Sequence, residues 1–132
     1  MPQLPTHTTV QTITRGLRVS VRSQYVAAQS EPENDYYFFA YHIQLHNESS
    51  THMRLVSRHW IITDGKGKQE QVKGPGVVGE FPSLGTGESF EYTSACPLST
   101  PYGVMHGSYQ MVTEYGDEFD AMIAPFALSV DG

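Results

Sequence analysis

The segment RHWIITDGKGKQEQVKGPGVVGE, residues 58–80, decides the fold. It begins with aromatic and β-branched residues around Trp60, which are typical of a buried strand. The Asp64-Gly65 pair is a tight-turn signal, and the polar stretch Lys68 to Lys73 predicts a returning strand. Trp60 is the expected core anchor, because so large a side chain loses most by staying in water. The segment therefore predicts a β-hairpin followed by a loop with three glycines.

Outward from this hairpin, apolar and polar residues alternate with a period of two, and helical periodicity is nearly absent. In the strand 53–64 this alternation places Val56, Arg58 and Trp60 on one face. We expect about seven strands, at residues 17–22, 36–47, 53–64, 68–73, 89–94, 108–113 and 118–128. This pattern predicts an all-β fold, an antiparallel sandwich of immunoglobulin or fibronectin III type.

The expected domain organisation is simple. The composition of residues 1–14 predicts a flexible N-terminal lead, and residues 15–130 are predicted to form one sandwich domain. The stretch 97–107 is predicted to be a loop because it carries two prolines and two glycines. Pro125 predicts a bulge or an edge position near the end of the last strand.

Composition narrows the class of protein. The single cysteine, Cys96, excludes an intramolecular disulfide and favours a reducing, cytoplasmic compartment. The first residues lack the basic and apolar regions of a secretory signal, and no stretch reaches the ~18 apolar residues of a membrane helix. We therefore expect no membrane partner.

Charge is unevenly distributed along the chain, whose net charge is −6. All eight basic residues precede Gly74, whereas eight of the fourteen acidic residues follow it. Strands from both parts interleave in most all-β folds, which favours an ordinary mixed surface over two oppositely charged faces. The acidic chain also lacks the basic stripe that nucleic-acid binding requires, so we expect no nucleic-acid partner.

Several segments together resemble the ApaG family of bacterial proteins. They are VRSQYV, QSEPENDYYFFAY, RHWIITDGKG, VKGPGVVGE, LGTGESFEYTS and TPYGVMHGSYQM, in this order, within about residues 17–128. Two positions depart from the family pattern, Pro75 between the first two glycines and Ala95 after the YTS segment. The resemblance implies a fibronectin-like sandwich and a genetic association with cobalt tolerance and magnesium efflux. It also implies relatives at the C-termini of an F-box protein and a polymerase-interacting protein, which hints at protein binding.

The three glycines satisfy the pattern G-x-G-x-x-G, which in dinucleotide-binding folds cradles a phosphate at a helix N-terminus. Here the motif is followed by Glu80-Phe81-Pro82-Ser83, which does not open a helix easily, and no βαβ unit surrounds it. We favour a structural loop with positive φ angles. The candidate phosphate, pyrophosphate or nucleotide loop stays open as the alternative, and its residues are Gly74, Gly76, Gly79, Lys73 and Arg58.

Other chemical groups give weaker signals. His42 and His46 share a strand face but lie ~13 Å apart, too far to chelate one ion. Glu118 and Asp120 are read as a solvated face rather than a cation site. We predict no metal ligands, no cofactor and no catalytic residues, because neither a nucleophile with an adjacent base nor a zinc motif is present.

The expected function is that of a non-enzymatic binding module for another protein, engaged through sheet edges and loops. The same edges allow a homo-oligomer. Binding of a small phosphate ligand by the glycine loop is the alternative, and divalent-cation binding is a further one.

Overall fold

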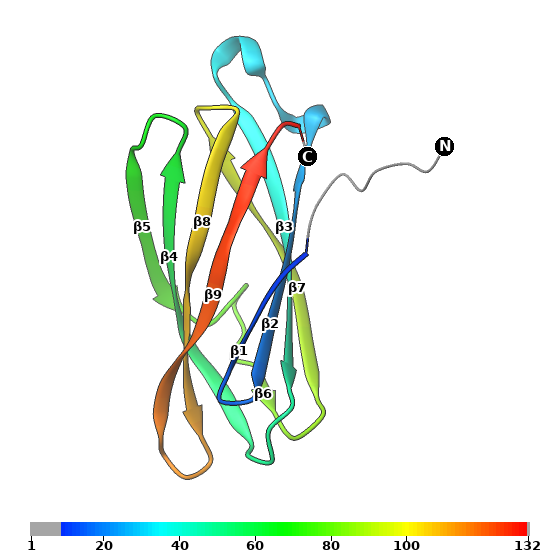
Figure 1. Cartoon of the computed structure of the whole chain (residues 1–132), viewed down its shortest axis with the longest axis vertical. Helices are drawn as coiled ribbons and strands as arrows, with labels where there is room; N and C mark the ends of the chain where they lie inside the picture. Colours follow the sequence, from blue (N-terminus) through cyan, green and yellow to red (C-terminus); the bar gives the residue numbers. More distant parts are fainter. Residues whose placement is uncertain (1–8, 132) are drawn as a thin grey trace, which may run out of the picture.

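Two antiparallel β-sheets pack face to face in the protein, whose computed structural model describes residues 9–131 (Figure 1). Between the second and third strands lie two 3-10 turns, η1 (Ala27–Gln29) and η2 (Pro32–Asn34). The described strands are β1 (Thr9–Thr14), β2 (Leu17–Tyr25), β3 (Tyr37–Asn47), β4 (Met53–Asp64), β5 (Gln69–Pro75), β6 (Ser83–Leu84), β7 (Ser89–Leu98), β8 (Tyr102–Thr113) and β9 (Glu118–Ser129).

Sheet I has the strand order β1-β2-β3-β7, and sheet II has the order β5-β4-β8-β9 with β6 beside β4. The strand pairs within both sheets are antiparallel. The predicted antiparallel sandwich of immunoglobulin or fibronectin III type is therefore confirmed, with nine strands in the described part of the chain rather than about seven.

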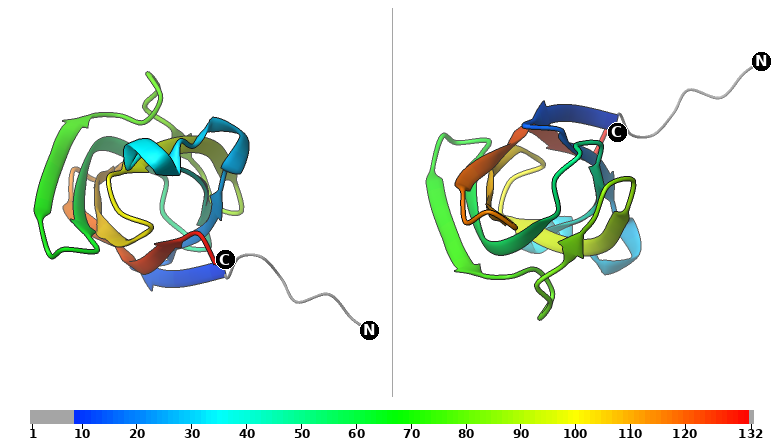
Figure 2. Two further views of the ribbon diagram at one scale, coloured as in Figure 1. Left: turned by 90° about the horizontal axis from the view of Figure 1, so that it is seen from above. Right: turned by 90° about the horizontal axis from the view of Figure 1, so that it is seen from below.

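The sandwich is closed along one side only. On that side β1 and β9 run next to each other, as both views of Figure 2 show. The hydroxyl of Thr12 donates to the carbonyl of Met122, and the N–H of Met122 donates to the Thr14 hydroxyl at 3.1 Å. On the opposite side β5 and β7 are the last strands of their sheets. The open side of the sandwich therefore has two strand edges, one from each sheet.

Trp60 lies at the centre of an aromatic group in the core and is 3 % exposed. Its ring meets Tyr41, Phe126 and Tyr109 at centroid distances of 5.3, 5.9 and 6.2 Å, all in edge-on geometry. Such aromatic pairs stabilise a fold beyond the area that they bury. Residues from both sheets thus converge on the tryptophan of the segment that decided the fold.

Residues Thr9–Thr14 form β1, although the sequence predicted a flexible lead through residue 14. The prediction was wrong for these six residues, because four of them are polar and, of the two apolar ones, Val10 packs against the core whereas Ile13 is exposed. Pairing with β2 and the threonine hydrogen bonds to β9 hold the strand instead. Residues 1–8 of the predicted lead lie outside the described residues.

The stretch 97–107, predicted to be a loop, belongs mostly to strands β7 and β8. Gly107 pairs with Trp60, and a Cβ at this position would lie 2.0 Å from the carbonyl oxygen of His59. The glycine therefore permits a close approach of two strands rather than a turn. Pro97 is accommodated because β7 is an edge strand.

Two β-bulges adjust the faces of sheet II. One lies between Leu55 and Ser57, so Val56 is 39 % exposed and does not share the inner face of Trp60 as predicted. The other lies where β9 passes Pro125, as the sequence predicted.

Within residues 9–131, no helix is long and apolar enough to cross a membrane.

Candidate functional site

Strand β5 is the free edge of sheet II and stands at the outside of the molecule (Figures 1 and 2). All of its residues are exposed except Gly74, which is half-buried. Its sequence, QEQVKGP, places only one aliphatic side chain, Val72, between polar ones. The strand is held by β4 on one side, and within residues 9–131 no strand pairs with it on the other.

The main-chain groups of β5 alternate between β4 and solvent. The N–H of Asp64 donates to the carbonyl of Lys68, and the N–H of Gly76 donates to that of Val56. With the register of the pair, these bonds assign Glu70, Val72 and Gly74 to hydrogen-bonded pairs with β4. The N–H and C=O groups of Gln69, Gln71 and Lys73 therefore point to the free edge, where Pro75 has no N–H to offer.

A cleft of about 330 Å³ opens between β5 and β7. Its floor includes the buried rings of Tyr41 and Trp60, and Val72 forms part of its wall. The size is within the range of ligand-binding pockets in proteins, about 300–1,000 Å³. The free edge of β5 thus borders a recess that has an apolar floor and leads toward the core.

Arg58 lies at one end of this cleft, where its guanidinium group covers Gly74. Its Nη1 donates to the carbonyl oxygens of Pro75 and Gly76, both at 2.9 Å. The described part of the chain contains the ion pair Arg18–Glu48 and the contact His42–Glu91, which is an ion pair only when the histidine is protonated. No carboxylate there pairs with Arg58. A half-buried cation with solvent-facing donors favours a negatively charged or carbonyl-rich ligand.

Glu70 lines the opposite end of the cleft and is exposed. It shares a face of β5 with Val72 and Gly74, because side chains two residues apart point the same way. The distance along the strand from Glu70 to Gly74 is about 13 Å. The cleft therefore has a cation near one end, an apolar centre and an anion near the other.

The glycine loop is a miniature hairpin without a helix behind it. Val77 and Glu80 exchange two main-chain hydrogen bonds, at 2.9 and 2.8 Å, and the turn residues Val78 and Gly79 have φ angles of 44° and 80°. This is a type I′ turn, and the positive φ of a β-branched valine is unusual. Since the N–H of Gly76 also bonds to Val56, the loop leaves few amides for a phosphate.

The candidate phosphate residues lie on two faces of the sheet. Arg58 and Gly74 are paired on the inner face, whereas Lys73 pairs with His59 on the outer one. The hydrogen bond from His59 to Gln71 lies on that outer face as well. Lys73, Arg58 and Gly74 nevertheless all border one groove of about 540 Å³, together with the carboxylate of Asp120. Arg58 donates hydrogen bonds to carbonyl oxygens of the loop. In an anion cradle, by contrast, the loop directs its N–H groups toward the ligand.

Sequence comparison places these features in a family. Residues 27–113 match the ApaG domain. The chain is 50 % identical to Protein ApaG of Beijerinckia indica over 117 residues, which are 89 % of this chain and 90 % of that protein. It is 53 % identical to Protein ApaG of Azoarcus sp. over 114 residues, 86 % of this chain and 90 % of that protein.

The chain belongs to the ApaG family. A crystal structure of a Bordetella pertussis protein described as ApaA agrees, with 46 % identity and a TM-score of 0.83, over 95 % of this chain and 97 % of that one. The resemblance recognised from sequence is thereby confirmed.

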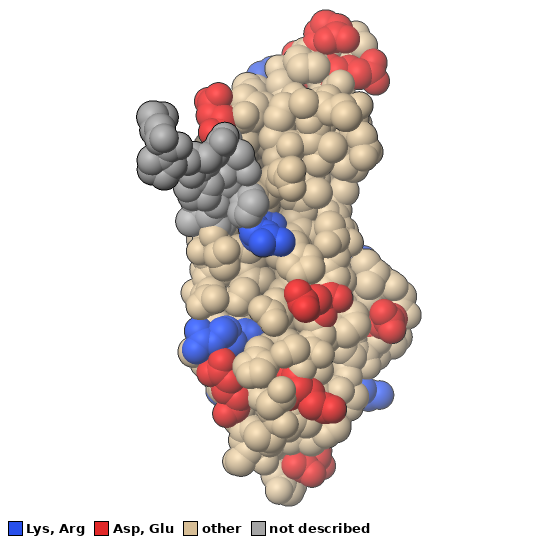
Figure 3. Space-filling model, turned by 90° about the vertical axis from the view of Figure 1, so that its right-hand side faces the viewer, with Lys and Arg blue, Asp and Glu red and all other residues tan. Residues whose placement is uncertain are grey.

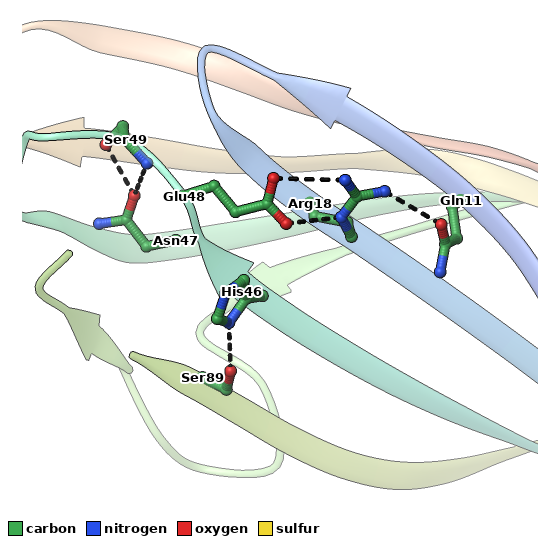
Figure 4. A network of polar contacts seen from close by, with 7 residues as sticks. All are labelled: Gln11, Arg18, His46, Asn47, Glu48, Ser49 and Ser89. Atoms are coloured by element: carbon green, nitrogen blue, oxygen red, sulfur yellow. Dashed lines mark hydrogen bonds and ion pairs between the residues drawn. The ribbon is translucent and has the colours of Figure 1, made fainter. Parts of the chain in front are cut away.

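Charges of both signs mix on the surface of this ApaG domain. Figure 3 shows one side of the molecule, on which basic and acidic side chains lie among each other. The one ion pair between an arginine and a carboxylate in the described chain is Arg18 Nε to Glu48 at 2.6 Å, with Gln11 as a further partner of Arg18 (Figure 4). Hydrogen bonding to Arg18 lowers the pKa of the Glu48 carboxyl. Exposed pairs of this kind stabilise a fold little.

The histidines of sheet I hold neighbouring strands together. His46 contacts the Ser89 hydroxyl at 2.6 Å (Figure 4), and His42 contacts Thr93 and Glu91 at 2.9 and 2.8 Å. All these contacts run from β3 to β7. Among the described residues, no three His, Cys, Asp or Glu side chains gather closely enough to hold a metal ion.

Cys96 lies in the wall of the cleft and is 6 % exposed. Burial, with a smaller effect of Glu70, raises the pKa of its thiol to about 11. Its hydrogen-bond partner is the carbonyl of Pro97, at 3.9 Å. Because the thiolate is the nucleophile, this thiol is suited to packing rather than to chemistry at neutral pH.

The free edge of β5 and the cleft beside it were not found as a site from the sequence. Strand order is a property of the whole fold, so a local pattern does not reveal which strand lacks a neighbour. One signal was present: the strand at 68–73 has a single aliphatic residue, which is typical of an edge.

Proposed function

We propose that this ApaG protein is a non-enzymatic binding module that captures an extended segment of another protein along β5. The observation that carries the proposal is the free edge of this strand, with its outward N–H and C=O groups at Gln69, Gln71 and Lys73. A segment added there would complete the main-chain hydrogen bonds, as in other strand-addition complexes.

The adjoining cleft supports the proposal, because main-chain bonds alone give affinity without specificity. Side chains of the added strand would alternate, and every second one would point toward the cleft between β5 and β7. We place the module in the cytoplasm, where its cysteine stays reduced. The association with cobalt tolerance and magnesium efflux would then be indirect, through the captured partner.

The test uses a library of displayed random heptapeptides, selected on the intact protein. The Gln71→Pro variant is the decisive one, because the N–H of Gln71 faces the free edge and its loss spares the bonds to β4. Gln71→Ala is the matched control, since both variants lose the contact with His59.

We expect peptides that bind the parent and Gln71→Ala but not Gln71→Pro. Peptides that bind Gln71→Pro equally well would place the binding surface elsewhere. A selection that enriches no peptide at all would also contradict the proposal.

A further inference from the structure

We infer that the cleft beside β5 contacts side chains of the partner's added strand. It selects an acidic, an aliphatic and a basic residue at alternate positions of that strand. The inference rests on the proposed strand addition and specifies the segment that is bound.

The side chains of an added strand would lie opposite those of β5. Glu70, Val72 and Gly74 make hydrogen-bonded pairs with β4, so on the free side they would form the non-hydrogen-bonded pairs of an added antiparallel strand. In such pairs the Cα atoms are only about 4.5 Å apart, which brings the side chains close together. The partner residues opposite these three positions would therefore project over the cleft.

Arg58 supplies a positive charge at one end of the cleft. The guanidinium of Arg58 lies against Gly74, whose missing side chain leaves it open to the free edge. Its Nη1 donates hydrogen bonds to two main-chain carbonyls, and no carboxylate of the described chain forms an ion pair with the guanidinium. An acidic residue opposite Gly74 would supply the missing partner.

Val72 and Glu70 line the rest of the cleft. Val72 is 36 % exposed, and the buried Trp60 lies next to it in the sheet. An aliphatic residue opposite Val72 would cover both side chains. Glu70 is exposed, and neither charged contact of the described chain, Arg18–Glu48 or His42–Glu91, includes it. A basic residue opposite Glu70 would pair with its carboxylate.

For an antiparallel strand these requirements give the order acidic-x-aliphatic-x-basic from N- to C-terminus. The probe is the blocked heptapeptide Thr-Glu-Thr-Leu-Thr-Lys-Thr, which spans β5 from Pro75 to Gln69. Its matched control replaces the glutamate by glutamine. Binding is followed by the fluorescence of Trp60, which lies at the floor of the cleft.

We expect the control peptide to bind the parent protein about tenfold more weakly, the size of one charge-assisted hydrogen-bonded contact. In Arg58→Gln the two peptides should bind alike, and in Arg58→Lys the difference should be intermediate, because lysine keeps the charge but not the planar fork. The Arg58→Lys variant also separates loss of recognition from loosening of the glycine loop.

Equal binding of both peptides to the parent, abolished by Gln71→Pro, would overturn the side-chain selection and leave strand addition in place. If neither heptapeptide binds while the random library yields other β5-dependent peptides, the inferred pattern is wrong and the proposed function stands.

Discussion

Arg58 of β4 donates a hydrogen bond from Nη1 to the carbonyl oxygen of Gly76 at 2.9 Å. This contact ties the glycine loop to the strand that carries Trp60. The contact therefore fixes the end of β5 against β4. The glycines of the loop are accordingly expected to serve the backbone conformation of the loop.

Gly76 and Gly79 should respond differently to alanine. Both have positive φ angles, 59° and 80°, but a Cβ on Gly76 would lie 2.4 Å from the carbonyl oxygen of Glu80, whereas Gly79 has open space. We expect Gly79→Ala to lower the free energy of unfolding by about 1–2 kcal/mol and Gly76→Ala by more than about 3 kcal/mol. Urea unfolding followed by Trp60 fluorescence measures both, and equal losses would refute the steric argument.

The hydroxyls of Tyr92 and Tyr109 hydrogen-bond across the core, from sheet I to sheet II. Tyr92 is 8 % exposed, whereas Tyr109 is fully buried. Replacing one tyrosine by phenylalanine leaves the other hydroxyl unpaired, at a cost of about 1–3 kcal/mol.

We expect Tyr92→Phe to destabilise the fold more than Tyr109→Phe does. It leaves the Tyr109 hydroxyl without a partner, and that hydroxyl has no access to water. The double variant should lose less stability than the two single losses combined. Additive losses in urea unfolding would mean that the hydroxyl pair contributes nothing.

Pyrophosphate should leave the glycine loop undisturbed. The amides of Gly76, Val77 and Glu80 are already engaged by main-chain carbonyls, and Lys73 lies on the other face of the sheet from Arg58. We expect no shifts of the amide resonances of residues 73–80 on titration with pyrophosphate to millimolar concentration. Saturable shifts confined to these residues at micromolar ligand would revive the phosphate-loop hypothesis.

Stability should fall at alkaline pH partly through Cys96. Burial raises the pKa of its thiol from 9.0 to about 11, so the folded protein keeps this proton where the unfolded chain loses it. The contribution is fully present below pH 9 and is lost as the pH rises through 11.

Cys96→Ala should therefore lose less stability between pH 9 and pH 11 than the parent does. Urea unfolding at a series of pH values measures the difference. Parallel pH profiles for the two proteins would show that Cys96 has an ordinary pKa.

The strands that the sequence predicted well are those with strong alternation on a buried face. Leu17, Val19 and Val21 in β2 and the long apolar pattern of β3 required no knowledge of the partner strands. β1 was missed because its hairpin with β2 turns at Arg15-Gly16 rather than at a common Asn-Gly or Asp-Gly pair, and because Thr12 and Thr14 contact β9, more than a hundred residues away in sequence. Such contacts leave no local signature.

The glycines and bulges limited the prediction in another way. The sequence predicts a loop at Gly107 because glycine is common in turns, whereas the structure needs a glycine there because the β4 backbone approaches closely. The bulge after Leu55 moved Val56 to the surface, and strict alternation does not anticipate an inserted residue.

The candidate site depended most on topology. The sequence makes Arg58 a candidate phosphate ligand beside the glycine loop only as the alternative interpretation; in the structure its register assigns it to the inner face and Lys73 to the outer one, although both border one groove. The pairing of strands decides which charges share a face. The free edge of β5 follows from the order β5-β4-β8-β9, which local sequence patterns do not encode.

The central claim is that β5 accepts an added strand. Amide hydrogen exchange with and without the blocked heptapeptide Thr-Glu-Thr-Leu-Thr-Lys-Thr tests it most directly, because the exchanging groups are the ones that would bond. The account predicts that the amides of Gln71 and Lys73 exchange rapidly in the free protein and become protected on binding, while that of Val72, already bonded to β4, changes little. Protection confined to other strands, with Gln71 and Lys73 unchanged, would contradict it.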